Sequence, residues 1–331
     1  MTAPYQPTSW SRRLLVALGS VVVLVVVAWA VAAIRDLDTG TGGGGGALDV
    51  PPMPQVREHA SEIGVPDSML GESRALRFRT LTPGEAIAVP GFIDVLGEPA
   101  IRRPAVHVVP MTDGAPFAYL VLRPFGEKRG EVLNGYRLGR WPAERWIMSR
   151  NYFNPDGFVE VTEANASLAL TPHFSLGSFV THDQRATWPK YVVLEEKLLD
   201  KLELVLQELN ARGIPTRHVV VLSGFRAPYY NERGVGEGMA RGSRHQYGDA
   251  ADVIVDDNDD GRMDDLNRDG RVDLADTGPI ALALARVESR HKSLVGGLGT
   301  YTATGPSGPF VHIDVRGTSA RWESGWWRRK N

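Results

Sequence analysis

Residues 242–278 of the chain read GSRHQYGDAADVIVDDNDDGRMDDLNRDGRVDLADTG. His245 and Asp252 are seven positions apart, a span of about 23 Å in a fully extended chain, so they can share an ion only if the chain turns between them. Gly248 is placed to supply that turn. Asp252 begins the apolar run VIV, where an unpaired carboxylate is costly. Taken singly, the two residues also fit a loop histidine and an aspartate that caps backbone amides.

A third candidate ligand lies in FVHIDV, residues 310–315, which alternates as a strand does. The alternation places His312 and Asp314 on one face and the apolar residues on the other. Two neutral imidazoles and one carboxylate leave a zinc ion with a net charge near +1 and an open position for water, which is typical of catalytic zinc. Such an ion lowers the pKa of its water toward about 7 and polarises a carbonyl oxygen.

These residues fall into three motifs that resemble one known family. The spacing Ser243-x-His245-x-x-Gly248-x-Ala250-x-Asp252 resembles the SxHxxGxAxD signature of the zinc D-alanyl-D-alanine peptidases. The stretch FVHIDVRGTSARW resembles the VHVD...RW ending of the murein endopeptidase branch, and SGFRAPYYN at 223–231 is similar to the segment SGxRxxxxN. The motifs follow the family's order, and the resemblance covers about residues 171–322.

The resemblance implies a fold, a metal and a reaction. We expect an α+β domain with an antiparallel sheet, zinc held by His245, Asp252 and His312, and hydrolysis of peptide bonds in peptidoglycan stems. Arg226 matches the arginine that holds substrate carboxylate or carbonyl groups, and its planar fork suits a carboxylate. Ser243 is expected to support the ligands from outside the coordination sphere. Removal of a terminal D-alanine and cleavage of a cross-link both remain open.

One position departs from the family pattern. Many relatives carry an acidic residue three positions before the last histidine ligand, where this chain has Pro309. Asp314 is the nearest carboxylate and could accept the water's proton. It could equally orient the imidazole of His312. Glu288 and His291 are more distant candidates for the base.

The acidic insertion, residues 256–276, predicts calcium binding. The stretch DLNRDGRVDLAD fits a calcium loop, with Gly270 at the sharp turn, and resembles dockerin-type loops. Its expected ligands are Asp265, Asn267, Asp269, the carbonyl of Arg271, Asp273 and Asp276. Nine aspartates against three arginines would repel one another without an ion. We therefore expect structural Ca²⁺ that ties the strand of Asp252 to the following helix.

An earlier copy of this pattern, DDNDDGRMDDLN, is incomplete because Asn267 stands at its last position. It could bind a second, weaker calcium ion, share Asp265 with its neighbour, or be acidic surface. Its possible ligands are Asp256, Asn258, Asp260 and Asp264.

Outside the motifs, periodicity predicts helices and strands over 171–331, the region that the resemblance implies is a peptidase domain. Residues 191–212 carry apolar residues at helical spacing and stop at Gly213. Strands are expected at 217–223 and 250–255, and a helix follows Pro279. Short alternating runs between about 75 and 162 predict a separate β-rich accessory module over 71–170.

The N-terminal segment predicts a membrane anchor. Residues 14–34 are uninterrupted apolar or small residues, long enough to cross the bilayer as one helix. Arg12 and Arg13 precede them, so residues 1–13 are expected in the cytoplasm and the remainder outside. A glycine-rich and proline-containing tether follows over 35–70. A cleaved signal peptide is the alternative.

Composition narrows the classes of function. A net charge of -2 provides no basic field for nucleic acid. Without cysteine, any transition metal must be held by His, Asp or Glu. The leading hypothesis is a membrane-anchored zinc peptidase that acts on cell-wall peptides. The alternatives are a wall-binding protein without hydrolysis and a calcium-dependent interaction module.

Overall fold

A computed structural model describes residues 63–111, 115–145, 152–302 and 305–324. All of these residues belong to one compact unit. The predicted anchor at 14–34, most of the predicted tether and the C-terminal residues 325–331 lie outside the described residues. Within these ranges, no helix is long and apolar enough to span a bilayer.

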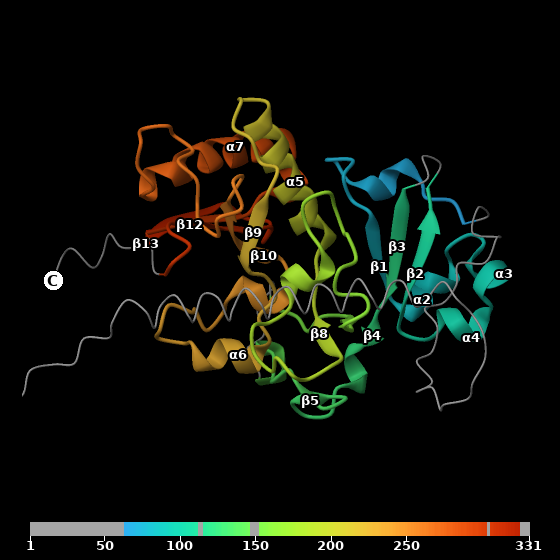
Figure 1. The fold of residues 1–331 in the computed structure, drawn as a ribbon. Coiled ribbons are helices and arrows are strands. Elements are labelled where there is room, and N and C mark those ends of the chain that lie inside the picture. The colour runs from blue at the N-terminus through green and yellow to red at the C-terminus, as the bar shows by residue number, and fades with distance from the viewer. Residues whose placement is uncertain (1–62, 112–114, 146–151, 303–304, 325–331) are drawn as a thin grey trace, which may run out of the picture. The chain divides into compact units, whose positions relative to one another are not determined.

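A five-stranded sheet forms the centre of the C-terminal part, with strand order β13-β11-β12-β10-β9 (Figure 1). Its pairs are antiparallel except β11 with β13, which run parallel. This confirms the expectation of a mixed helix and strand fold with an antiparallel sheet. The strands are β9 (Val219–Ser223), β10 (Ala250–Val255), β11 (Gly297–Tyr301), β12 (Phe310–Asp314) and β13 (Ala320–Ser324).

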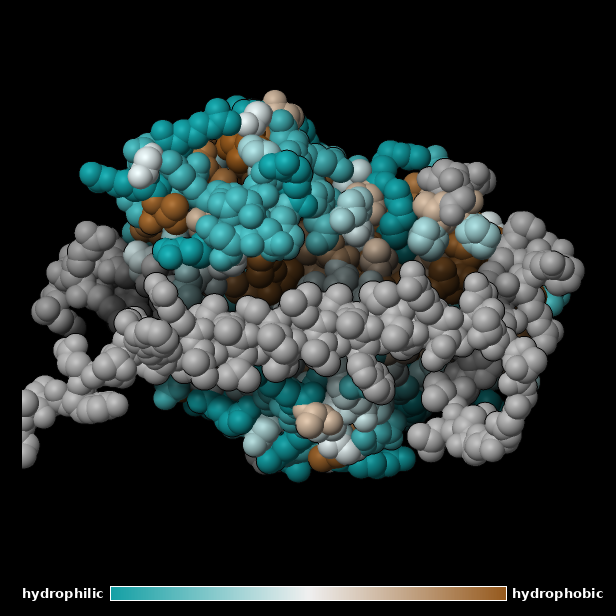
Figure 2. Space-filling model, viewed as in Figure 1, coloured by the Kyte–Doolittle hydropathy of each residue, from teal (hydrophilic) through white to brown (hydrophobic). Residues whose placement is uncertain are grey.

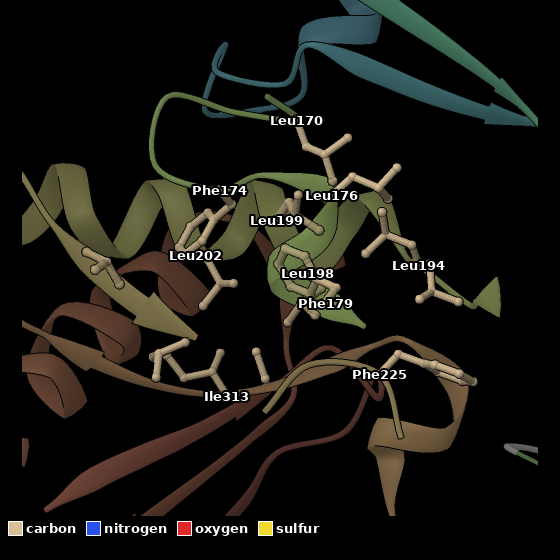
Figure 3. Close-up of a cluster of buried hydrophobic side chains, with 14 of the residues drawn as sticks. Leu170, Phe174, Leu176, Phe179, Leu194, Leu198, Leu199, Leu202, Phe225 and Ile313 are labelled. Atoms are coloured by element: carbon tan, nitrogen blue, oxygen red, sulfur yellow. The ribbon is translucent and has the colours of Figure 1, made fainter. Parts of the chain in front are cut away.

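Two helices, α5 (Glu196–Asn210) and α7 (Thr277–Arg290), pack against each other and against β12. Figure 3 shows leucines of α5 gathered with Phe174, Phe179 and Ile313 in the core between helix and sheet. The outer surface around both helices is mostly hydrophilic in Figure 2, as amphipathic helices require. Helix α5 begins five residues later than predicted, because Lys190–Val192 form strand β8, whose three residues are all buried.

The N-terminal part contains a smaller sheet with strand order β1-β3-β2. Its strands are β1 (Phe78–Leu81), β2 (Ala105–Pro110) and β3 (Pro116–Val121), and short helices α2 (Pro83–Ile87), α3 (Phe92–Leu96) and α4 (Glu98–Ile101) pack with them around a core of their own. The predicted β-rich module is therefore partly helical here. Ile63 and Leu70 are buried in this core, so the predicted tether at 35–70 ends earlier than expected.

The second half of the predicted accessory module belongs to the main core. Strands β4 (Arg123–Pro124) and β7 (Gly157–Val161) pair with each other, β7 pairs with β8, and β5 (Val132–Leu133) forms a hairpin with β6 (Tyr136–Arg137). Trp141 is fully buried, and its Nε1 donates to the carbonyl of Gln246 at 2.8 Å, next to the first histidine ligand. A boundary at residue 170 thus does not separate two cores.

Candidate metal centre

The turn between the two ligands of the first motif has the form predicted from Gly248. A 3-10 helix, Arg244–Tyr247, carries His245 and ends at Gly248, which adopts φ 68° and ψ 10°. A Cβ at Gly248 would overlap the backbone carbonyl of Val193. Glycine is required there for both reasons, since other residues rarely adopt positive φ and a side chain has no room. The chain then enters β10 and reaches Asp252.

The candidate site lies on a row of paired residues that crosses the five-stranded sheet. Asp252 pairs with His312, His312 with Gly299, and Gly299 with Trp322, while Ser223 lies opposite Asp252 on the other side. The register of β9 and β10 shifts at Asp252, where β9 holds one extra residue. Such bulges increase the local twist and redirect side chains. The sheet itself therefore places the second and third ligands side by side.

The triad, His245, Asp252 and His312, presents three ligand atoms to one point. His245 Nε2 lies 3.2 Å from Asp252 Oδ1 and 3.1 Å from His312 Nδ1, and the last two atoms are 3.0 Å apart. Zinc bonds of about 2.0–2.2 Å in a tetrahedron require ligand atoms about 3.4 Å apart, so a small outward shift accommodates the ion. All three residues are buried. The donor set and its spacing fit zinc.

In each imidazole, the ring nitrogen that faces away from the other ligand atoms already has a hydrogen-bond partner. His245 Nδ1 lies 2.7 Å from the carbonyl of Gly224, so it donates its proton there and leaves Nε2 as the free lone pair. His312 Nε2 lies 3.1 Å from Asp314 Oδ2, which leaves Nδ1 for the metal. Burial lowers the pKa of His245 and favours the neutral ligand form. Burial alone would raise the pKa of Asp252, but the two histidines hold it well below its usual value.

Arg226 stands behind the triad, held by two partners. Its Nε donates to Ser223 Oγ at 2.7 Å, and its Nη2 forms an ion pair with Asp252 Oδ2, the oxygen that faces away from the ligand atoms. Part of the guanidinium that was expected to bind a substrate carboxylate is therefore engaged with Asp252, a candidate metal ligand. Nη1 is the nitrogen to which no described residue offers an acceptor. Ser243 is buried, but His245 Nδ1 donates to the carbonyl of Gly224 and not to the side chain of Ser243.

Asp314 is fully buried and its oxygens have several partners. Besides His312, it accepts from the Gly297 amide at 2.7 Å and from the guanidinium of Arg316 at 2.9 Å. Burial would raise the pKa of Asp314, but the bonds from His312 and Arg316 hold it well below its usual value. Its contact is with Nε2 of His312, the nitrogen opposite the ligand atom. This geometry favours the orienting alternative over the base.

The other two candidates for a base lie elsewhere. Glu288 accepts from buried Lys201 at 2.7 Å and from the amide of Gly296 at 2.9 Å. His291 lies 3.4 Å from a carboxylate oxygen of Glu72. Neither residue has a contact with the triad.

The sequence did not predict an aromatic group beside the triad. The ring of Trp322 lies 5.2 Å from that of His312, centroid to centroid, and Tyr301 stacks on Phe310 at 4.6 Å. Trp322 was part of the RW motif, but its contact depends on Gly299, whose missing side chain leaves space for the indole. Only the strand register, which brings these residues into one row, reveals the group.

In the acidic insertion, the two copies of the calcium pattern share one hydrogen-bond arrangement. The first aspartate of each loop, Asp256 or Asp265, accepts from the amides at positions five and six, at 2.8–3.1 Å. Asp276 closes the second loop by accepting from the amides of Asn267 and Asp273. The side chains predicted to bind calcium are thus brought together around their own backbone, and those of the second loop are mostly exposed.

A second cluster of metal-binding residue types was not predicted. His218, the residue before β9, has its Nδ1 3.3 Å from Asp259 Oδ1 and 3.6 Å from Asp256 Oδ2. Unlike the triad, this cluster is largely exposed, since only Asp256 is buried.

Comparison with known families finds similarity over part of this region. Residues 173–278 match a family model described as Peptidase M15. No curated protein and no solved structure matches the chain significantly. The matched region contains Arg226, His245, Asp252 and the whole acidic insertion. Two of the three candidate metal ligands therefore lie inside the similarity to this peptidase family, and the third comes from the strand that pairs with β10.

Proposed function

We propose that this chain is a zinc-dependent peptidase that hydrolyses peptide bonds of peptidoglycan stem peptides or cross-links. The observation that carries the proposal is the triad, in which three buried ligand atoms face one another while the outer nitrogens of both histidines are engaged. The match of residues 173–278 to Peptidase M15 supports the same reading. A structural zinc site would use four protein ligands, whereas three leave a position for chemistry.

Each residue of the candidate site has its own role in the proposed reaction. His245, Asp252 and His312 would hold the ion, and zinc bound there supplies a Lewis acid and a water of lowered pKa. Gly224 and Asp314 fix the orientation of the two imidazoles, which is how outer partners tune metal ligands. Arg226 holds the outer oxygen of Asp252 and offers Nη1 to a carbonyl or carboxylate oxygen of the peptide.

We propose that residues 14–34 anchor the chain in the cytoplasmic membrane with the peptidase outside, where peptidoglycan lies. We also propose that the acidic insertion binds structural calcium. The loop pattern and the shared hydrogen-bond arrangement of its two copies support this role.

The test of the peptidase uses the full chain, purified in detergent and loaded with zinc in the presence of calcium. Purified muropeptides are incubated with it and analysed by liquid chromatography and mass spectrometry. Loss of alanine would identify a carboxypeptidase, and conversion of dimers to monomers an endopeptidase. His245→Ala should abolish either product, while His218→Ala, a histidine of the exposed cluster, should not.

One observation favours a different function. Pro309 stands where relatives have a base, and no described carboxylate other than the engaged Asp314 contacts the triad. A protein that binds zinc and muropeptides but leaves every muropeptide intact would be a wall-binding protein instead.

A further inference from the structure

Tyr301 lies on the same face of the sheet as the triad. It is the last residue of β11 and pairs with Phe310, while Gly299, two residues earlier, pairs with His312. Because side chains two apart on a strand share a face, Tyr301 is the diagonal neighbour of His312. Its ring stacks on Phe310 with an interplanar angle of 3°, which fixes the direction of the phenol.

Trp322 determines how the hydroxyl of Tyr301 is used. Trp322 Nε1 lies 2.8 Å from the hydroxyl oxygen of Tyr301. An indole N–H can only donate, so the tyrosine oxygen must accept this bond. The phenolic proton is therefore left to donate to another acceptor, and none of the described residues takes it.

Trp322 places this hydroxyl near the triad, because the same indole that bonds it at 2.8 Å lies 5.2 Å from the ring of His312. Burial raises the pKa of Tyr301, with a further contribution from the charge of Asp252, while Trp322 and Arg226 lower it in part. The hydroxyl consequently keeps its proton at neutral pH. Tyr301 is only partly buried.

We propose that Tyr301 is a catalytic residue that donates a hydrogen bond to the oxyanion formed at the scissile carbonyl, and that Trp322 is the residue that positions its hydroxyl. This inference rests on the proposed peptidase function. Water adds to the carbonyl carbon, a C–O bond forms, and the C=O π electrons move to the oxygen, where Tyr301 stabilises the charge. The C–N bond then breaks and the leaving nitrogen gains a proton that derives from the water. Tyr301 keeps its own proton throughout.

The test compares Tyr301→Phe with the wild-type protein on the muropeptide that the wild type cleaves. Phenylalanine keeps the stack on Phe310 and removes only the hydroxyl. We expect kcat to fall on the order of 100-fold, as for loss of one oxyanion donor, while KM and bound zinc stay unchanged. A phosphinate analogue of the cleaved bond, measured by calorimetry, should lose affinity by a similar factor, because it mimics the charged tetrahedral state.

Trp322→Phe tests the positioning role. It keeps an aromatic ring over Gly299 but removes the N–H, so we expect a smaller fall in kcat, about 10-fold, with the same unchanged KM. Because Trp322 acts through Tyr301, the double variant should be no slower than Tyr301→Phe alone. Additive losses would overturn this part of the proposal.

Tyr119→Phe is the matched control. Tyr119 lies in the N-terminal sheet, and the substitution removes a hydroxyl that donates to the carbonyl of Gly64. It should leave kcat unchanged. If the wild type cleaves muropeptides and Tyr301→Phe keeps kcat within about twofold, the inference fails and the peptidase stands. The inference would also be overturned if Tyr301→Phe lost bound zinc, or if it were less stable than the wild type without the phosphinate. Tyr301 would then have a structural role. If the wild type cleaves nothing, the proposed function fails and the inference falls with it.

Discussion

The triad and the acidic insertion gather similar residue types but satisfy them in different ways. In the triad, strands and a buried turn hold the side chains, and outer atoms bond to Gly224, Arg226 and Asp314. In the insertion, carboxylates such as that of Asp265 accept from amides of their own exposed loop. The fold thus predetermines the geometry of the first site, whereas the second depends on local backbone and on charge neutralisation. We therefore expect a metal ion to take part in catalysis at the triad and to stabilise the fold at the acidic insertion.

The largest effect should come from removing a ligand of the triad. His245→Ala should lose bound zinc and lower peptidase activity at least about 1,000-fold, since the remaining groups cannot activate water. Metal analysis and muropeptide digestion measure both quantities. His218→Ala removes a histidine from the exposed cluster and should retain zinc and activity. Equal losses in the two variants would contradict the assignment of the metal centre.

The two regions also differ in how strongly they require glycine. Gly248→Ala should reduce the free energy of unfolding by about 3 kcal/mol, because it combines a positive φ with a clash against the carbonyl of Val193. Gly270→Ala in the insertion has a φ of 83° but open space around it, so about 1 kcal/mol is expected. Denaturant unfolding with calcium present measures both. A larger loss for Gly270→Ala would show that the insertion is the more constrained region.

Calcium should change stability without being needed for the geometry of the triad. Stripping the protein with a chelator should lower its melting temperature, and calcium at 100 times its dissociation constant should restore about 2.7 kcal/mol. Asp265→Asn, which removes a charge from the first position of the loop, should weaken this response. His245→Ala should keep it, because the two sites are separate. An unchanged melting temperature during calcium titration of the stripped protein would refute the structural role.

The sequence predicted those parts of the site that depend on spacing and alternation. Gly248 turns the chain as expected, and the alternation in β12 puts His312 and Asp314 on one face, because both follow from local backbone geometry. The position of His312 beside Asp252 depends instead on the pairing of β12 with β10. The roles of Tyr301 and Trp322 could not be read in this way, since they depend on the register of three strands and on the missing side chain of Gly299. The short helices α2–α4 were missed because four or five residues do not display a helical period.

The smallest expected effect is that of Asp314→Asn on zinc affinity, and it tests the role of this carboxylate. If it orients His312, Asp314→Asn should lower zinc affinity about 10- to 100-fold, and excess zinc should restore activity. If it is the base, zinc would stay bound and activity would remain lost at any zinc concentration. Asp200→Asn is the matched control, because Asp200 is also buried but accepts from the amides of Glu72 and Ser73 in the N-terminal part. The geometry favours the first outcome, since the carboxylate of Asp314 contacts the nitrogen of His312 that faces away from the other two ligands.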